Sequence, residues 1–325
     1  MLRTKMTELF GITYPVMSAL MTLHSGGQLA AAVSQAGGLG SFGGINPGGP
    51  DYVHDQVKHI RSQTGNPFCI GFITHLIPEM SQNFDAALEE NPPVVFFSFG
   101  DPKEWLVRAK DAGATVICQA QSLEDVAEAV AAGTDVLLVQ GSAAGGHTGQ
   151  MNLLPFLSHI VDRYPDIPVM ASGGISTGRA LAAVLAGGAE GANLGTAFLA
   201  TPENAEVPDA YKEHVVRSDG QDTKLTKLYD VLGGGAWPRE IAGRVYNNRF
   251  VQTWDGRDSD IQERFEELAS DAAEAWEKHD IEVASVYMGQ SAVSVSSMRQ
   301  AGDVLRDICG KAERLLGERF RELGL

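Results

Sequence analysis

The chain has 325 residues, a length that a single α/β barrel with insertions commonly reaches. With 44% hydrophobic and 20% charged residues, it can bury a core large enough to offset the conformational entropy lost on folding. The 41 acidic and 25 basic residues give a formal charge of −16, which opposes docking on phosphate backbones or anionic lipid surfaces. Composition therefore predicts a folded protein that binds neither nucleic acid nor membranes.

The N-terminus has no apolar signal core, and no apolar run approaches the roughly 18 residues needed to cross a bilayer. We therefore expect a cytoplasmic protein. Its three cysteines, Cys69, Cys118 and Cys309, are odd in number and far apart, which argues against a disulfide framework and a zinc site. We interpret each as a small buried side chain.

Between residues 14 and 196 the chain repeats a short apolar run, a Gly-containing loop and an amphipathic stretch. The strand-like runs lie at 15–18, 39–43, 68–73, 94–98, 115–120, 136–140, 169–172 and 191–194. Helical periodicity fills the segments between them, as at Leu123, Val126 and Val130, where Ser122 is the expected N-cap. Eight parallel strands covered on both faces predict a (β/α)₈ TIM barrel over residues 1–200.

After Thr201 the hydrophobic period changes, and apolar positions within 261–272 and 304–320 predict helices. We expect residues 201–325 to form a helical extension of the same domain that folds over the barrel mouth as a lid. The glycines at 233–235 are a candidate hinge. The aromatic residues around this hinge are interpreted as packing against the barrel, with walls of the pocket as the alternative; they are Tyr229, Trp237, Tyr246 and Trp254.

The loop after the sixth predicted strand, residues 140–149, surrounds one histidine with small residues. Glycines let backbone approach a flat ligand closely, because no Cβ intrudes. His147 is the side chain there that can exchange a proton near neutral pH. An incidental histidine on a flexible loop is the alternative. The position after a barrel strand favours a catalytic His147.

Two further glycine turns follow the seventh and eighth predicted strands. Ser172, Gly173 and Gly174 lead into a helix, and the eighth strand ends at Gly195 and Thr196. Backbone N–H groups of such turns and the positive end of the following helix attract an anion without a basic side chain. One Gly-Gly turn alone would be explained by backbone geometry. The pair predicts a phosphate site.

The loop after the first strand could lay the backbone of Ala19, Leu20 and Met21 along an aromatic ring system, with His24 following. Barrel core is the alternative interpretation of these apolar residues. His24, His75 and His147 come from unrelated loops and lack any ligand spacing, so we predict no metal site.

In this order, the motifs resemble the nitronate monooxygenase (formerly 2-nitropropane dioxygenase) family, which includes flavin-type enoyl-acyl-carrier-protein reductases and related NADH:quinone reductases. The resemblance covers residues 15–21, 30–40, 145–147, 171–174, 195–196, 248–249 and 289–290. It implies FMN, with its phosphate at Gly173, Gly174, Gly195 and Thr196 and its ring near Ala19, Leu20, Met21 and Gln140. The other expected cofactor contacts are Gly145, Gly146, Ser172 and Gln290.

The same resemblance assigns roles in the reaction. His147 matches the family's catalytic histidine, which takes the α-proton of a neutral nitroalkane or hydrogen-bonds the nitro oxygens of an anionic nitronate. Electrons then pass to the flavin, and oxygen completes the reaction. The expected substrate-pocket residues are His24, Ser98, Tyr287 and Met288.

Three positions depart from the family pattern. Ser98 stands where many bacterial members carry a second histidine, Gly71 replaces a flavin-contacting asparagine, and Ala143 replaces a frequent acidic residue. Each change bears on which substrate is accepted, and none removes the glycine loops of the flavin site.

We therefore predict an FMN-dependent oxidoreductase, a nitronate monooxygenase that oxidises alkyl nitronates with O₂. One alternative is an NAD(P)H-dependent FMN reductase acting on a quinone or an enoyl thioester. Another is a non-catalytic barrel that binds FMN or another phosphate ligand. The expected partners are a small-molecule substrate and O₂ or another electron acceptor, with a homodimer left open.

Overall fold

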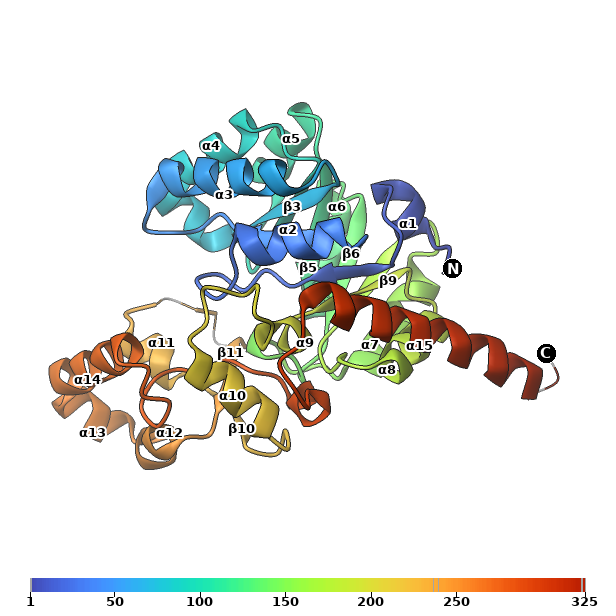
Figure 1. Ribbon diagram of the computed structural model, residues 1–325. Helices are drawn as coiled ribbons and strands as arrows, with labels where there is room; N and C mark the ends of the chain where they lie inside the picture. The colour runs from blue at the N-terminus through green and yellow to red at the C-terminus, as the bar shows by residue number, and fades with distance from the viewer. Residues whose placement is uncertain (1, 236, 239, 323, 325) are drawn as a thin grey trace.

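The computed structural model describes residues 2–235, 237–238, 240–322 and 324 (Figure 1). The main sheet has eight parallel strands. The bounds of these strands agree with the predicted runs, except that β1 and β2 each begin one residue later. The strands are β1 (Val16–Ser18), β2 (Gly40–Gly43), β3 (Phe68–Ile73), β4 (Val94–Ser98), β5 (Thr115–Ala120), β6 (Val136–Gln140), β8 (Val169–Ser172) and β9 (Gly191–Leu194).

The sheet closes on itself between its first and last strands. Its order is β1-β9-β8-β6-β5-β4-β3-β2, and a parallel bridge between Met17 and Leu39 joins β1 to the start of β2. The Ser18 N–H donates to the Leu39 carbonyl at 3.1 Å, and the Leu39 N–H donates to the Val16 carbonyl at 3.0 Å. Closure of eight parallel strands makes this a TIM barrel, as predicted.

Helices surround the barrel. They are α2 (Gly27–Gln35), α3 (Gly49–Gln63), α4 (Ser81–Glu89), α5 (Lys103–Asp111), α6 (Leu123–Ala132), α7 (Leu153–Arg163) and α8 (Gly178–Ala186), with the 3₁₀ helix η1 (Thr74–Met80) after β3. Ser122 caps α6 as predicted: its hydroxyl accepts from the Asp125 N–H, and the Asp125 carboxylate accepts from the Ser122 N–H. This reciprocal pair satisfies donors that the first turn of a helix leaves open.

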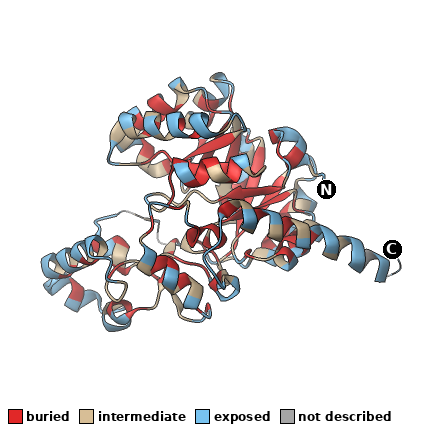
Figure 2. Ribbon diagram, in the orientation of Figure 1, coloured by how far each residue is buried: buried red, intermediate tan, exposed pale blue. Residues whose placement is uncertain are grey.

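The barrel interior is a packed core. The N-terminal helix α1 (Lys5–Phe10) contributes Met6 and Phe10 to a buried cluster with Met17, Phe96 and Met170 from the strands. A second, larger cluster fills the layer between the strands and the helices. Figure 2 shows the same division, with burial concentrated on the strands and the inner helix faces. The three cysteines are free and buried, as predicted.

Beyond β9, the chain leaves the barrel and forms a lobe beside it, which we call the extension and define as residues 200–300 (Figure 1). Its elements follow the short helix α9 (Thr196–Leu199); they are α10 (Asp209–Arg217), β10 (Thr223–Thr226), α11 (Leu228–Leu232), β11 (Ala242–Tyr246), α12 (Arg249–Trp254), α13 (Asp258–Glu263), α14 (Phe265–Glu277) and the 3₁₀ helix η2 (Gln290–Ser294).

The extension is not purely helical, which corrects the periodicity-based expectation. β10 and β11 pair antiparallel, and β11 pairs in turn with β7 (Gly146–Thr148) from the barrel loop after β6. Strands of three to five residues are too short to display an alternating pattern. The small sheet therefore ties the extension to the loop that carries His147.

The last helix, α15 (Ala301–Glu322), returns to the barrel and packs against α8 and α2. Its Leu305, Ile308 and Ala312 belong to the core cluster of the strand–helix layer. By packing, α15 belongs to the ring of barrel helices, although its sequence position had grouped it with the extension. Among the described helices, none combines the length and apolar character that crossing a bilayer requires.

Candidate active site

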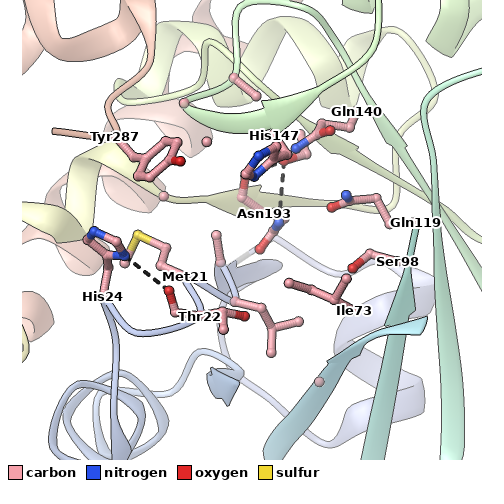
Figure 3. A pocket seen from close by; sticks show the side chains of 18 of the residues that line it. Met21, Thr22, His24, Ile73, Ser98, Gln119, Gln140, His147, Asn193 and Tyr287 are labelled. Carbon is pink, nitrogen blue, oxygen red and sulfur yellow. Dashed lines mark hydrogen bonds between the residues drawn. The ribbon is translucent and has the colours of Figure 1, made fainter. Parts of the chain in front are cut away.

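A cavity of about 450 Å³ opens at the carboxyl ends of the barrel strands, where the extension faces the barrel (Figure 3). Its volume lies in the usual range for small-molecule and cofactor sites, roughly 300–1,000 Å³. Loops after β1, β3, β4, β6, β8 and β9 provide most of its walls, and the extension adds Trp237, Tyr287, Met288 and Ser291. The barrel architecture thus gathers segments from all along the chain at one place.

Nearly all the residues predicted for the site line this cavity. Those that do are Ala19, Leu20, Met21, His24, Ser98, Gln140, Gly145, Gly146, His147, Ser172, Gly173, Gly174, Gly195, Thr196, Tyr287 and Met288. Gln290 is not among the lining residues. It is exposed, and its N–H donates to the Ala143 carbonyl at 3.1 Å, so its backbone fastens η2 to the loop after β6.

The glycines of the cavity wall differ in what fixes them. Gly173 has a φ of +96°, and a Cβ there would lie 2.5 Å from the Gly141 carbonyl oxygen, so the local fold itself excludes a side chain. At Gly195, by contrast, a Cβ would meet protein only at ordinary contact distances, 3.5 Å from Ala19 Cβ and 3.7 Å from Met21 Sδ. A side chain at position 195 would therefore be compatible with the protein packing. Because the residue is glycine, this part of the cavity stays open.

Amide side chains form a polar part of the wall. Gln119, Gln140 and Asn193 line the cavity, and the Asn193 Oδ1 is buried without a hydrogen-bond partner among the described residues. The Asn193 amide nitrogen donates to the Ser172 hydroxyl at 3.3 Å. Such a buried acceptor is costly unless a ligand or water satisfies it. Open glycine turns beside the unpaired Asn193 oxygen fit a flat heterocycle that carries a phosphate, as a flavin nucleotide does.

His147 lies on β7, where it pairs with Gly243 of β11. Its Nε2 is 2.7 Å from the Asp230 Oδ1, and the two side chains are only 16% and 8% exposed. The indole of Trp237 stacks on the imidazole, with ring centroids 3.6 Å apart and planes inclined by 7°. The loop histidine that the sequence singled out is therefore held by the extension from several sides.

His24 lines another part of the wall and is half-buried. Its Nδ1 donates to the Thr22 carbonyl at 3.0 Å, since a carbonyl oxygen can only accept. Burial lowers the pKa of the imidazole, and the hydrogen bond to Thr22 partly opposes that effect. The ring packs edge-on against Trp276 and Tyr287 of the extension. A neutral imidazole at this wall joins the barrel to the extension.

The departures from the family pattern have local explanations. The Ser98 hydroxyl donates to the Phe72 carbonyl at 3.3 Å, which places a neutral group at the end of β4. A Cβ at Gly71 would lie 2.2 Å from Leu20 Cδ2, so the leucine fills the space that a side chain at position 71 would need. Within the described ranges, no group of three or more His, Cys, Asp or Glu is placed to hold a metal ion.

Several cavity residues escaped the sequence analysis. Gln119 and Asn193 point inward from strands, and inward alternation along β5 and β9 is the signal that could have found them. Asp230 carried no such signal, because it lies on α11, 83 residues after the histidine that it contacts. Trp237 was interpreted chiefly as packing, and it lines the cavity.

Comparison with known proteins places these features in a family. The family model described as nitronate monooxygenase matches residues 3–82 and 76–311. Among curated relatives, (3aS,4S,5R,7aS)-5-hydroxy-7a-methyl-1-oxo-octahydro-1H-indene-4-carboxyl-CoA dehydrogenase from Rhodococcus jostii is 33% identical over 229 residues. That match covers 70% of this chain and 64% of the dehydrogenase, so the chain spans less than two thirds of that relative's length.

Two solved structures are similar along nearly the whole chain. FabK from Thermotoga maritima is 30% identical with a TM-score of 0.88, covering 99% of this chain and 100% of that one. Nitroalkane oxidase from Streptomyces ansochromogenes is 28% identical with a TM-score of 0.81, covering 97% and 99%. The barrel, the cavity and the histidine loop agree with the match of the family model. The chain is therefore an oxidoreductase that belongs to the nitronate monooxygenase family.

Proposed function

We propose that this chain is an FMN-dependent oxidoreductase that oxidises alkyl nitronates with O₂. The observation that carries the proposal is one cavity in which the glycine turns after β8 and β9 face the imidazole of His147. The proposed partners are a small-molecule substrate and O₂, and the cytoplasmic location and a homodimer stay predictions.

Different groups of cavity residues would bind the phosphate and the ring of FMN. Gly173, Gly174, Gly195 and Thr196 would hold the phosphate, because turns after the last two barrel strands present backbone donors to an anion. The amides of Gln140 and Asn193 would meet the polar edge of the ring. When bound, FMN supplies the electron acceptor for oxidation of the substrate.

The residues of the chain supply binding and proton handling. His147 either removes the proton next to a nitro group or donates a hydrogen bond to the oxygens of an anionic nitronate. Apolar walls from Phe96, Leu199 and Met288 keep bulk water from the reacting carbon. The cavity must hold a cofactor of about thirty heavy atoms, so the space that remains suits a small substrate such as an alkyl nitronate.

An NAD(P)H-dependent reductase that acts on a quinone or an enoyl thioester is the second candidate. It is favoured by the similarity to FabK and to a CoA-ester dehydrogenase. A non-catalytic FMN-binding barrel is the third candidate, and the imidazole at the cavity argues against it, because pure binding gives no need for a titrating group.

The test is anaerobic absorbance spectroscopy of the FMN-loaded protein mixed separately with propyl-1-nitronate, NADH and NADPH. Flavin reduction by the nitronate, with no response to either nicotinamide, supports the monooxygenase. Bleaching by NADH or NADPH without a response to nitronate moves the assignment to the reductase. A protein that cannot take up FMN overturns both.

A further inference from the structure

We propose that Asp230 is a positioning residue that holds His147 with its proton on Nε2, so that Nδ1 is the nitrogen that receives a proton from substrate. This inference rests on the proposed function for its substrates, but the tautomer itself can be measured without turnover. It adds a residue of the extension to a site whose predicted members came mostly from barrel loops.

The contact between the two side chains sets the tautomer. Asp230 Oδ1 lies 2.7 Å from His147 Nε2, and an ionised carboxylate can only accept a hydrogen bond. The other oxygen of Asp230, Oδ2, is buried and has no partner among the described residues. His147 is thus the hydrogen-bond partner of this carboxylate within the described part of the chain, and losing it would leave a buried charge uncompensated.

The imidazole is also held against rotation. Trp237 covers one face of the ring, and the pairing of His147 with Gly243 fixes its backbone. Gly243 permits this approach, because a Cβ there would lie 2.9 Å from the Tyr287 ring and 3.7 Å from the His147 Nε2. The ring is held at one face, at its backbone and at one nitrogen. A rotation that swapped the positions of Nδ1 and Nε2 would therefore require the extension to move away from the barrel loop.

The remaining ring nitrogen of His147 is the one available to the substrate. His147 lines the cavity, and no hydrogen bond to its Nδ1 occurs among the residues that the structure describes. With Nε2 protonated, Nδ1 carries the lone pair. A neutral nitroalkane then loses its α-proton to Nδ1: the C–H bond breaks, its electron pair stays on the nitronate, and the imidazole becomes an imidazolium that faces Asp230. Nothing is oxidised or reduced in this step.

A second pair in the extension provides a matched control. His214 Nε2 lies 3.2 Å from Asp222 Oδ2, and its ring packs on Tyr246 with centroids 3.7 Å apart. This pair has the same types of group, a histidine beside a carboxylate and an aromatic ring, but His214 Nε2 has no hydrogen-bond partner among the described residues. Neither His214 nor Asp222 lines the cavity. Asp222→Asn should therefore disturb the extension as Asp230→Asn does, without touching the proton acceptor.

The experiment compares Asp230→Asn and Asp222→Asn in the FMN-loaded enzyme, using 1-nitropropane and its nitronate anion. Only the neutral substrate needs a base. We expect Asp230→Asn to lower kcat/KM for nitropropane by about ten- to a hundredfold, as loss of orienting partners does elsewhere, and to lower that for the nitronate by less than about threefold. Asp222→Asn should leave the ratio of the two values unchanged.

The tautomer is read independently by ¹⁵N NMR of the histidine rings in the wild-type protein at mildly alkaline pH, with His147→Gln to assign the signals. We expect a proton on Nε2 of His147. A proton on Nδ1, or equal losses for both substrates in Asp230→Asn, overturns the inference. If the wild-type enzyme oxidises neither substrate, the proposed function fails, and the NMR spectrum still decides the tautomer.

Discussion

The barrel and the extension contribute to the cavity in different ways. The barrel supplies most of the wall, with apolar and amide side chains and with open backbone at Gly173, Gly195 and the loop around Gly146. The extension adds side chains that meet His147, namely Asp230, Trp237 and Tyr287. Backbone at strand ends can hold a cofactor under many sequences, whereas the contacts to the imidazole depend on the identity of these side chains.

The two regions also differ in their cores. The barrel rests on two large buried clusters, while the extension has smaller clusters of its own, one around Tyr211 and Met288 and one around Phe250 and Leu268. Changes in the extension therefore need not disturb the strands. We expect substitutions in the barrel wall to affect cofactor binding and substitutions in the extension to affect turnover with the cofactor still bound.

The largest effect is expected where the regions meet. His147→Gln removes the group that exchanges the proton, and we expect kcat/KM for a neutral nitroalkane to fall by about 10²- to 10⁴-fold with FMN still bound. Steady-state oxygen consumption and the flavin spectrum measure the two properties. His159→Gln, on an exposed position of α7, is the control. Unchanged turnover in His147→Gln would favour the non-catalytic barrel.

A barrel substitution should show the opposite pattern. Gly195→Ala adds a methyl group with ordinary protein contacts, so we expect little change in stability. We expect the FMN dissociation constant to rise about tenfold, which corresponds to a loss of about 1.4 kcal/mol in binding free energy. Fluorescence titration of the apoprotein with FMN measures it. Gly317→Ala in α15, where a Cβ meets no atom within 4 Å, is the matched control. Equal FMN affinity in both variants would move the cofactor away from Gly195.

An extension substitution should spare the cofactor. Trp237→Ala removes the ring stacked on His147, and an aromatic stack of about 0.5–1.5 kcal/mol predicts a roughly fivefold lower kcat/KM. FMN occupancy should stay at the wild-type value. Trp254→Ala, which removes an extension indole outside the cavity, should change neither quantity. Loss of FMN in Trp237→Ala would contradict the expectation that the extension affects turnover and not cofactor binding.

The smallest effect concerns the wall where both regions touch. Burial lowers the pKa of His24 from 6.5 in the folded state, so as pH falls below 6.5 the unfolded chain binds a proton that the folded chain resists. Stability should therefore decrease in that range. His24→Asn keeps a donor near Thr22 without a titrating ring and should flatten the decrease, as measured by urea unfolding between about pH 7.5 and 5.5.

His214 contributes in the same direction, because burial also lowers its pKa, although Asp222 opposes the shift. The informative quantity is thus the difference between the wild type and His24→Asn. His214→Asn should remove a separate part of the pH dependence. An unchanged slope in His24→Asn would mean that this histidine is solvated and that the loop after β1 packs less closely on the extension than the contact with Trp276 indicates.

The sequence by itself determined the barrel and much of the cavity wall. Strand runs, helix periodicity and the Ser122 cap depend on neighbours within a few residues, so they can be read locally. The glycine turns could be placed as well, because every carboxyl end of a parallel barrel strand reaches the same rim. The position of His147 after a barrel strand already favoured a catalytic role, and resemblance to a family then assigned the reaction in which it acts.

Tertiary structure alone decided what surrounds that histidine. Asp230 and Trp237 reach His147 because β11 pairs with β7, a contact between short strands nearly a hundred residues apart. The return of α15 to the barrel was equally hidden, since an amphipathic pattern reveals an apolar face but not the surface that the face covers. Contacts between distant segments are set by the packing of the whole chain, and no local pattern encodes them.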